Sequence, residues 1–144
     1  MRTQTVLIDA TFVQALSEAT NENHDDALQI YRELVEQFRV EEVRLMAQKS
    51  VLDEATDEIR SKLLAPVEVL RISARHRRAA AMATPRVSPE TALTLAIAAH
   101  DRIRTIASFD PELAYFDINI LSAQGVSART EPLFESSETD ASAL

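Results

Sequence analysis

The chain has 144 residues, of which 46% are hydrophobic, and a net charge of −8, because 23 aspartates and glutamates outnumber 15 lysines and arginines. We expect one domain with a substantial core, and any nucleic acid would have to be held by a local basic patch or a metal ion. The absence of cysteine excludes disulfides, thiolate catalysis and cysteine–zinc sites. A single glycine argues against a P-loop, a dinucleotide fingerprint and a Gly-x-Ser-x-Gly nucleophile elbow.

The first half of the chain predicts two strands and three helices. In chain order these are a strand over 6–8, helices over 11–19 and 26–38, a strand over 43–47 and a helix over 50–64. The strands are short apolar runs, and the second helix has apolar residues at every third or fourth position. Ser50 and Asp53 have the spacing of a capping box, which predicts that the third helix begins at Ser50.

The second half of the chain continues this alternation. In chain order it predicts a strand over 67–72, a basic helix over 73–82, an apolar helix over 91–99, a strand over 103–107, a helical turn over 111–115 and a strand over 118–121. Ser88 and Pro89 indicate where the apolar helix begins, and a helix that is apolar on nearly every side must be buried. Alternating strands and helices predict a three-layer α/β/α sandwich with a mainly parallel, about five-stranded sheet.

The composition changes at Gly125. Beyond it the chain is rich in Ser, Thr, Glu and Asp, and Leu133-Phe134 is its hydrophobic pair, which is too little apolar surface to form a core. We therefore predict one domain over 1–124 and an acidic, disordered tail over 125–144. No apolar run approaches the roughly 20 residues of a membrane span, and no secretory segment is recognised, so we expect a cytoplasmic protein.

Two aspartates stand at the ends of predicted strands. Asp9 ends the first strand, and Asp110 follows the strand over 103–107. Because the carboxyl ends of parallel strands open onto one crevice, we expect these two acids to meet there. Together with Glu54, which follows the second predicted strand, they should raise one another's pKa values by repulsion, and a divalent ion should relieve this repulsion and stabilise the fold. Each aspartate also has the position of a helix N-cap, and that structural interpretation stays open.

Four short motifs, in this order and spacing, resemble the PIN-domain family, the ribonuclease fold of many toxin–antitoxin toxins of the VapC type. They are the opening Val6-Leu7-Ile8-Asp9, Glu54 after the second strand, the stretch from Val87 to Ala98, and Ser108-Phe109-Asp110. The resemblance covers about residues 5–121 and implies a PIN-like fold.

The resemblance also implies an activity and a set of site residues. A PIN-type endoribonuclease uses clustered acids to hold Mg²⁺ or Mn²⁺ over the scissile phosphate, and Asp9, Glu54 and Asp110 fall on these acidic positions. Thr91 falls where the family usually has another acid. We therefore expect either a weakened nuclease or a catalytically silent scaffold that binds RNA or protein. An RNA substrate, an antitoxin partner and a homodimer are further implications.

Other charged residues have weaker claims on function. Glu90 precedes Thr91, but one residue turns a helix by about 100°, so the Glu90 side chain should leave the cleft unless the first turn shifts. Arg71, Arg75 and Arg78 belong to the one basic concentration of the chain, where they can hold RNA phosphates or simply form a solvated helix face. Taken alone, Glu54 is more typical of an ordinary solvated helix acid than of a site residue.

Overall fold

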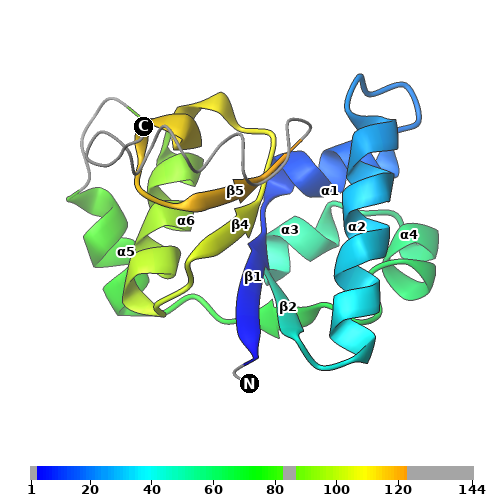
Figure 1. Cartoon of the computed structure of the whole chain (residues 1–144). Coiled ribbons are helices and arrows are strands. Elements are labelled where there is room, and N and C mark those ends of the chain that lie inside the picture. Colours follow the sequence, from blue (N-terminus) through cyan, green and yellow to red (C-terminus); the bar gives the residue numbers. More distant parts are fainter. Residues whose placement is uncertain (1–2, 83–86, 123–144) are drawn as a thin grey trace, which may run out of the picture.

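The computed structural model describes residues 3–82 and 87–122. In these residues five strands form one sheet with the order β3-β2-β1-β4-β5, and every neighbouring pair is parallel (Figure 1). The strands are β1 (Gln4–Ile8), β2 (Val43–Gln48), β3 (Glu68–Leu70), β4 (Thr105–Ala107) and β5 (Asn119–Leu121). The predicted α/β class and parallel sheet are confirmed.

Helices cover both faces of this sheet (Figure 1). One side holds α1 (Ala10–Ser17), α2 (His24–Arg39), α3 (Lys49–Asp53) and α4 (Asp57–Lys62), and the other holds α5 (Ala74–Ala81) and α6 (Pro89–His100). Val6 and Ile8 of β1 pack into the core with α1 and α2, whereas Leu7 packs into the core that contains Ile97 of α6. Successive strand side chains point to opposite faces, so β1 serves both cores and the three-layer prediction is confirmed.

The apolar helix α6 begins where its sequence predicts. The Ser88 hydroxyl accepts a hydrogen bond from the Thr91 backbone N–H at 3.2 Å, and Pro89 occupies the first turn. No residue from Thr91 to Ala98 is exposed. The helix is therefore a buried layer against the sheet, and its first turn is held at the carboxyl edge of the strands.

The predicted capping box at Ser50 and Asp53 is wrong. Helix α3 begins at Lys49 without a side-chain cap, and Asp53 ends it, bound to Lys49 at 2.8 Å. The single helix predicted over 50–64 is also two helices, because the Thr56 side chain caps a new start at α4. A threonine followed by acids makes a better helix start than Ser50, whose backbone is already inside a helix.

Some predicted elements differ only at their ends or lie outside the structure. The strands predicted over 67–72, 103–107 and 118–121 are each three residues long in the structure. The helical turn over 111–115 is the 3₁₀ helix η1 (Pro111–Tyr115). The predicted tail over 125–144 lies outside the described residues, so the division at 124 stays a prediction. Within the described ranges, no helix combines the length and apolarity needed to cross a membrane.

Candidate functional site

The carboxyl ends of β1 and β4 bring Asp9 and Asp110 together. These strands are neighbours, Ile8 pairs with Ala107, and the Asp9 N–H donates to the Ala107 carbonyl at 3.2 Å. Asp110 follows β4 by three residues, and its charge contributes to raising the pKa of Asp9. The expected meeting of the two acids at neighbouring strand ends is therefore confirmed.

Two hydroxyl groups fix the Asp9 carboxylate. The Ser108 hydroxyl donates to Asp9 Oδ2 and accepts from the Asp110 N–H at 2.9 Å. The Thr11 hydroxyl donates to Asp9 Oδ1 at 2.7 Å and accepts from the Phe109 N–H at 2.9 Å. Sequence reasoning did not assign these hydroxyls a role, although each lies two residues from a candidate acid, a spacing at which side chains reach local backbone groups.

Both aspartates are also helix caps, so the structural interpretation is correct as well. Asp9 Oδ1 accepts from the Phe12 N–H at 3.0 Å, and Asp110 Oδ1 accepts from the Glu112 N–H at 2.9 Å. A carboxylate offers about four acceptor positions. With the hydroxyl contacts included, both carboxylates keep acceptor positions that these bonds do not use, and a metal ion needs such positions.

Burial is the largest influence on the pKa of the Asp9 carboxyl. Asp9 is only 6% exposed, and this desolvation raises its pKa, while hydrogen bonds from Ser108 and Thr11 oppose the rise. The charge of Asp110 raises the pKa further, as the smallest of these influences. The expected acid–acid repulsion is present, but it is secondary to burial. A cation beside Asp9 would offset the cost of holding a charge there.

Thr91 reaches the same site from α6. Its side chain is buried, and its hydroxyl donates to Asp110 Oδ2 at 2.5 Å while accepting from the Ser88 hydroxyl at 3.0 Å. Glu90, by contrast, is exposed. The position predicted to hold an acid thus faces Asp110, but it supplies a hydrogen-bond donor in place of a negative charge.

Glu112 is an acid of this site to which the sequence analysis assigned no role. Its Oε1 accepts from the Ser88 N–H at 3.1 Å, which ties η1 to the start of α6. The Ser88 backbone, followed by the Thr91 side chain, lowers the pKa of Glu112. The signal in the sequence was the Asp-Pro-Glu spacing after a strand, but only the approach of α6 gives Glu112 its partners.

Glu54 is exposed and immediately follows α3. Within the two described ranges, the one set of three potential ligand atoms that all lie within 4.8 Å of one another belongs to His76, His100 and Asp101. Asp9, Glu54 and Asp110 do not form such a compact triad. Metal binding by all three acids therefore stays a prediction.

The histidine cluster is organised as a helix cap. His76 Nδ1 accepts from the Ser73 N–H at 2.9 Å, so neutral His76 carries its proton on Nε2 and donates it to Asp101 Oδ1 at 3.1 Å. The ring of His100 packs edge-on against His76, with centroids 5.0 Å apart. A metal ion on Nε2 would require the proton on Nδ1, where the Ser73 N–H already points. The arrangement therefore favours capping of α5 over metal binding.

Comparisons with known proteins agree with the architecture. No family model matches the sequence, and no curated protein matches it. The chain is similar to the crystal structure of VapC20 from Mycobacterium tuberculosis, a toxin that cleaves the sarcin–ricin loop, with a TM-score of 0.57 and 17% sequence identity. The match covers 76% of this chain and 92% of that chain. The chain has a PIN-like fold.

A cleft of about 1210 Å³ opens at the carboxyl ends of β2 and β3. Four cationic side chains line it, namely Lys49, Arg60, Arg71 and Arg77, together with the single acid Asp53. Of the three arginines predicted to hold RNA, Arg71 is therefore part of this wall, whereas Arg75 and Arg78 are exposed on α5 outside it.

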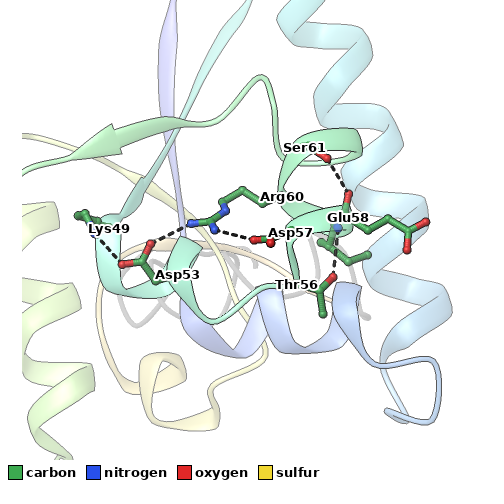
Figure 2. A network of polar contacts seen from close by, with 8 residues as sticks. Lys49, Asp53, Thr56, Asp57, Glu58, Arg60 and Ser61 are labelled. Carbon is green, nitrogen blue, oxygen red and sulfur yellow. Dashed lines mark hydrogen bonds and ion pairs between the residues drawn. The ribbon is translucent and has the colours of Figure 1, made fainter.

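Asp53, the acid in the cleft lining, forms ion pairs with Lys49 and Arg60 (Figure 2). Asp53 binds the Lys49 ammonium at 2.8 Å and the Arg60 guanidinium at 3.0 Å, and Arg60 also binds Asp57 at 3.1 Å. These hydrogen bonds and charges lower the pKa of Asp53, with the Lys49 hydrogen bond as the largest cause. Asp53 therefore holds two positive groups side by side in the cleft wall.

Proposed function

We propose that this chain is a divalent-metal-dependent endoribonuclease of the PIN type. The observation that carries the proposal is the pairing of Asp9 and Asp110 at the ends of two adjacent parallel strands. The crevice at the carboxyl ends of such strands is the usual ligand site of open α/β sheets. The PIN-like fold and the nearby basic cleft support the same activity.

The donor set fits Mg²⁺ or Mn²⁺. These ions take hard oxygen ligands, and Mg²⁺ commonly contacts only one or two carboxylates while it keeps several waters. Asp9 and Asp110 would hold the ion through the acceptor positions that their hydrogen bonds leave open. Glu54, on the loop between α3 and α4, would act on the ion from a more exposed position.

The chain's own groups prepare the site for this chemistry. When bound, the divalent ion supplies positive charge that activates a water and stabilises the leaving oxygen. Ser108 and Thr11 fix the orientation of Asp9, and Thr91 fixes that of Asp110. A site whose side chains are already held by such a network needs little reorganisation when a substrate binds.

RNA is the proposed substrate, with Arg71 as a proposed phosphate contact; Arg75 and Arg78, which the sequence also suggested for this role, lie outside the cleft and are not part of the proposal. An antitoxin protein as partner and a homodimer are further parts of the proposal, supported by the likeness to a VapC toxin. In this proposal the chain cleaves RNA at the Asp9–Asp110 pair when no antitoxin is bound to it.

A second candidate function follows from Thr91. Its hydroxyl occupies an acceptor position of Asp110 at 2.5 Å and adds no charge, so it lowers the attraction of the site for a cation. The alternative proposal is a PIN-like scaffold that binds RNA or a protein without cutting.

One experiment separates the two functions. The purified chain is incubated with labelled RNAs, among them a sarcin–ricin-loop hairpin, in Mn²⁺, Mg²⁺ or EDTA. We expect metal-dependent cleavage that Asp9→Asn and Asp110→Asn abolish and that Glu54→Gln reduces. Asp117→Asn is the matched control, because Asp117 is an exposed acid that precedes β5. Cleavage that persists in EDTA, or in both site variants, would reject the acid pair as the catalytic centre.

A further inference from the structure

We propose that the cleft lined by Lys49, Arg60, Arg71 and Arg77 binds a stretch of single-stranded RNA and leads its backbone to the acid pair. This inference deepens the proposed function and rests on it, because it identifies where the substrate lies. It differs from the sequence-based prediction in its residues, since Arg77 joins Arg71 while Arg75 and Arg78 lie elsewhere.

Charge is the first argument for an anionic ligand. The whole chain has a net charge of −8, yet four cations and one acid line this cleft. The ion pairs of Lys49 and Arg60 with Asp53 and Asp57 leave the other two cations unused. No ion pair within the described ranges involves Arg71 or Arg77, so both are available to phosphates.

The position of the cleft is the second argument. Its lining includes Gln48, the last residue of β2, and continuing the β1–β2 register by two residues beyond Leu7 and Met46 places Gln48 beside Asp9. The cleft and the acid pair are thus neighbouring parts of the carboxyl edge of the sheet. An RNA strand that lies in the cleft would reach the acid pair where the cleft ends.

The apolar lining favours a single-stranded nucleic acid over a simple anion. Leu52, Val69, Leu70, Ile72 and Leu93 line the same cleft as the cations. Val69 keeps 51% of its surface exposed, so it is accessible to a ligand that lies in the cleft. Unpaired nucleotides offer both chemistries, because their phosphates meet the cations while their bases and riboses cover apolar surface. In a duplex the base faces are stacked away from such a surface.

The test measures RNA binding without cleavage. A fluorescently labelled single-stranded RNA is titrated with the full chain in EDTA over a series of salt concentrations, and binding is read by fluorescence anisotropy. The key variant is Arg71→Ala/Arg77→Ala. The matched control is Arg75→Ala/Arg78→Ala, which removes the same charge from exposed arginines, both of them on α5. Arg71→Lys/Arg77→Lys keeps the charge and the cleft, and circular dichroism confirms that each variant is folded.

We expect the Arg71→Ala/Arg77→Ala chain to bind RNA at least about tenfold more weakly at low salt, with the slope of log K against log salt reduced by about 1.4, which is the loss of two phosphate contacts to a single strand. The Arg75→Ala/Arg78→Ala chain should bind like the parent, and the lysine variant should keep most of the salt slope. Equal losses in the two alanine variants, or no RNA binding by the parent, would overturn the cleft as the RNA site. So would polyglutamate binding that equals RNA binding and depends on the same two arginines, which would assign the cleft to an acidic protein segment.

Failure of this inference is distinguishable from failure of the proposed function. If the parent cleaves RNA through Asp9 and Asp110 while Arg71→Ala/Arg77→Ala binds RNA normally, the cleft is wrong and the nuclease stands. If the cleft variant loses binding while no chain cleaves RNA, the cleft stands and the catalytic proposal fails.

Discussion

Replacing Thr91 by aspartate should make the metal-free protein less stable and the metal-bound protein more active. The Thr91 hydroxyl donates to Asp110 Oδ2 at 2.5 Å, so Thr91→Asp removes a hydrogen bond to a charged group, which is worth about 1.5–3 kcal/mol. It also places a second carboxylate within about 4 Å of Asp110, where two unit charges repel by about 4 kcal/mol at an effective dielectric constant of 20. Asp110 is partly exposed, so screening by solvent reduces this sum.

We expect a net loss of about 2–4 kcal/mol in the free energy of unfolding of Thr91→Asp in EDTA, which lowers its melting temperature by roughly 5–15 °C. Metal should reverse this loss. A divalent ion at about 100 times its dissociation constant stabilises a folded protein by about 2.7 kcal/mol, and the added carboxylate should tighten binding. Melting by circular dichroism across a Mn²⁺ titration measures both effects, and cleavage of a labelled RNA measures the gain in activity.

Thr91→Val is the matched control, because it keeps the size of the side chain and removes the hydroxyl without adding charge. It should lose about 1–3 kcal/mol, with no increase in metal stabilisation over the parent. If Mn²⁺ stabilises Thr91→Asp no more than Thr91→Val, and cleavage does not increase, then the acid pair is not a metal site. The scaffold function would then be the better account of this chain.

Of three further predictions, two test the hydrogen-bond network around the acid pair and the third tests the stability of the fold away from it. Burial raises the pKa of Asp9 above its ordinary value of 3.8. The stability that the protonated Asp9 contributes is therefore complete below pH 3.8 and is lost as the pH rises through the folded-state pKa. In EDTA, Asp9→Asn keeps a good cap, so it should melt at a higher temperature than the parent at neutral pH and lose the pH dependence that Asp9 causes. Ser108→Ala should cost about 1–3 kcal/mol in urea unfolding and weaken metal stabilisation, because Asp9 loses a donor and the Asp110 N–H loses its acceptor; unchanged stability would contradict the network. Tyr31→Phe should cost about 1–2 kcal/mol, since its hydroxyl donates to the Leu63 carbonyl at 2.6 Å, but RNA cleavage should not change, and a loss of cleavage in a folded Tyr31→Phe chain would show coupling that we do not expect.

The architecture and the acid pair could be predicted because their signals are local. Short apolar runs mark the strands, and in a parallel sheet a polar residue that ends a strand lies at the carboxyl edge. Asp9 and Asp110 follow this rule, and the parallel pairing of β1 with β4 makes them neighbours. The same local signal also predicted caps, and both aspartates are caps, so the two interpretations of one pattern were never exclusive.

Features that depend on tertiary approach could not be predicted. Glu112 meets Ser88 and Thr91 only because η1 packs against the start of α6. The cleft cation Arg77 could not be told from Arg75 by sequence, because two residues on one helix differ by about 200° in direction and the facing wall decides which of them matters. The break between α3 and α4 was not predicted either, because Thr56 forms a cap only when the preceding helix has already ended.

The hydrogen bonds that build this site also limit how it can bind metal. Asp9 accepts two hydrogen bonds on Oδ1 and one on Oδ2, so it cannot bind an ion with both oxygens without losing a cap or a hydroxyl contact. Asp110 accepts one hydrogen bond on each oxygen, so each of its oxygens keeps one open acceptor position. An ion held through one oxygen of each acid would keep most of its coordination shell as water, which Mg²⁺ tolerates well. Binding should then be weak, and activity should require millimolar metal. Thr91→Asp should lower that requirement more than any change to Glu54, because Thr91 is buried against Asp110 while Glu54 remains exposed.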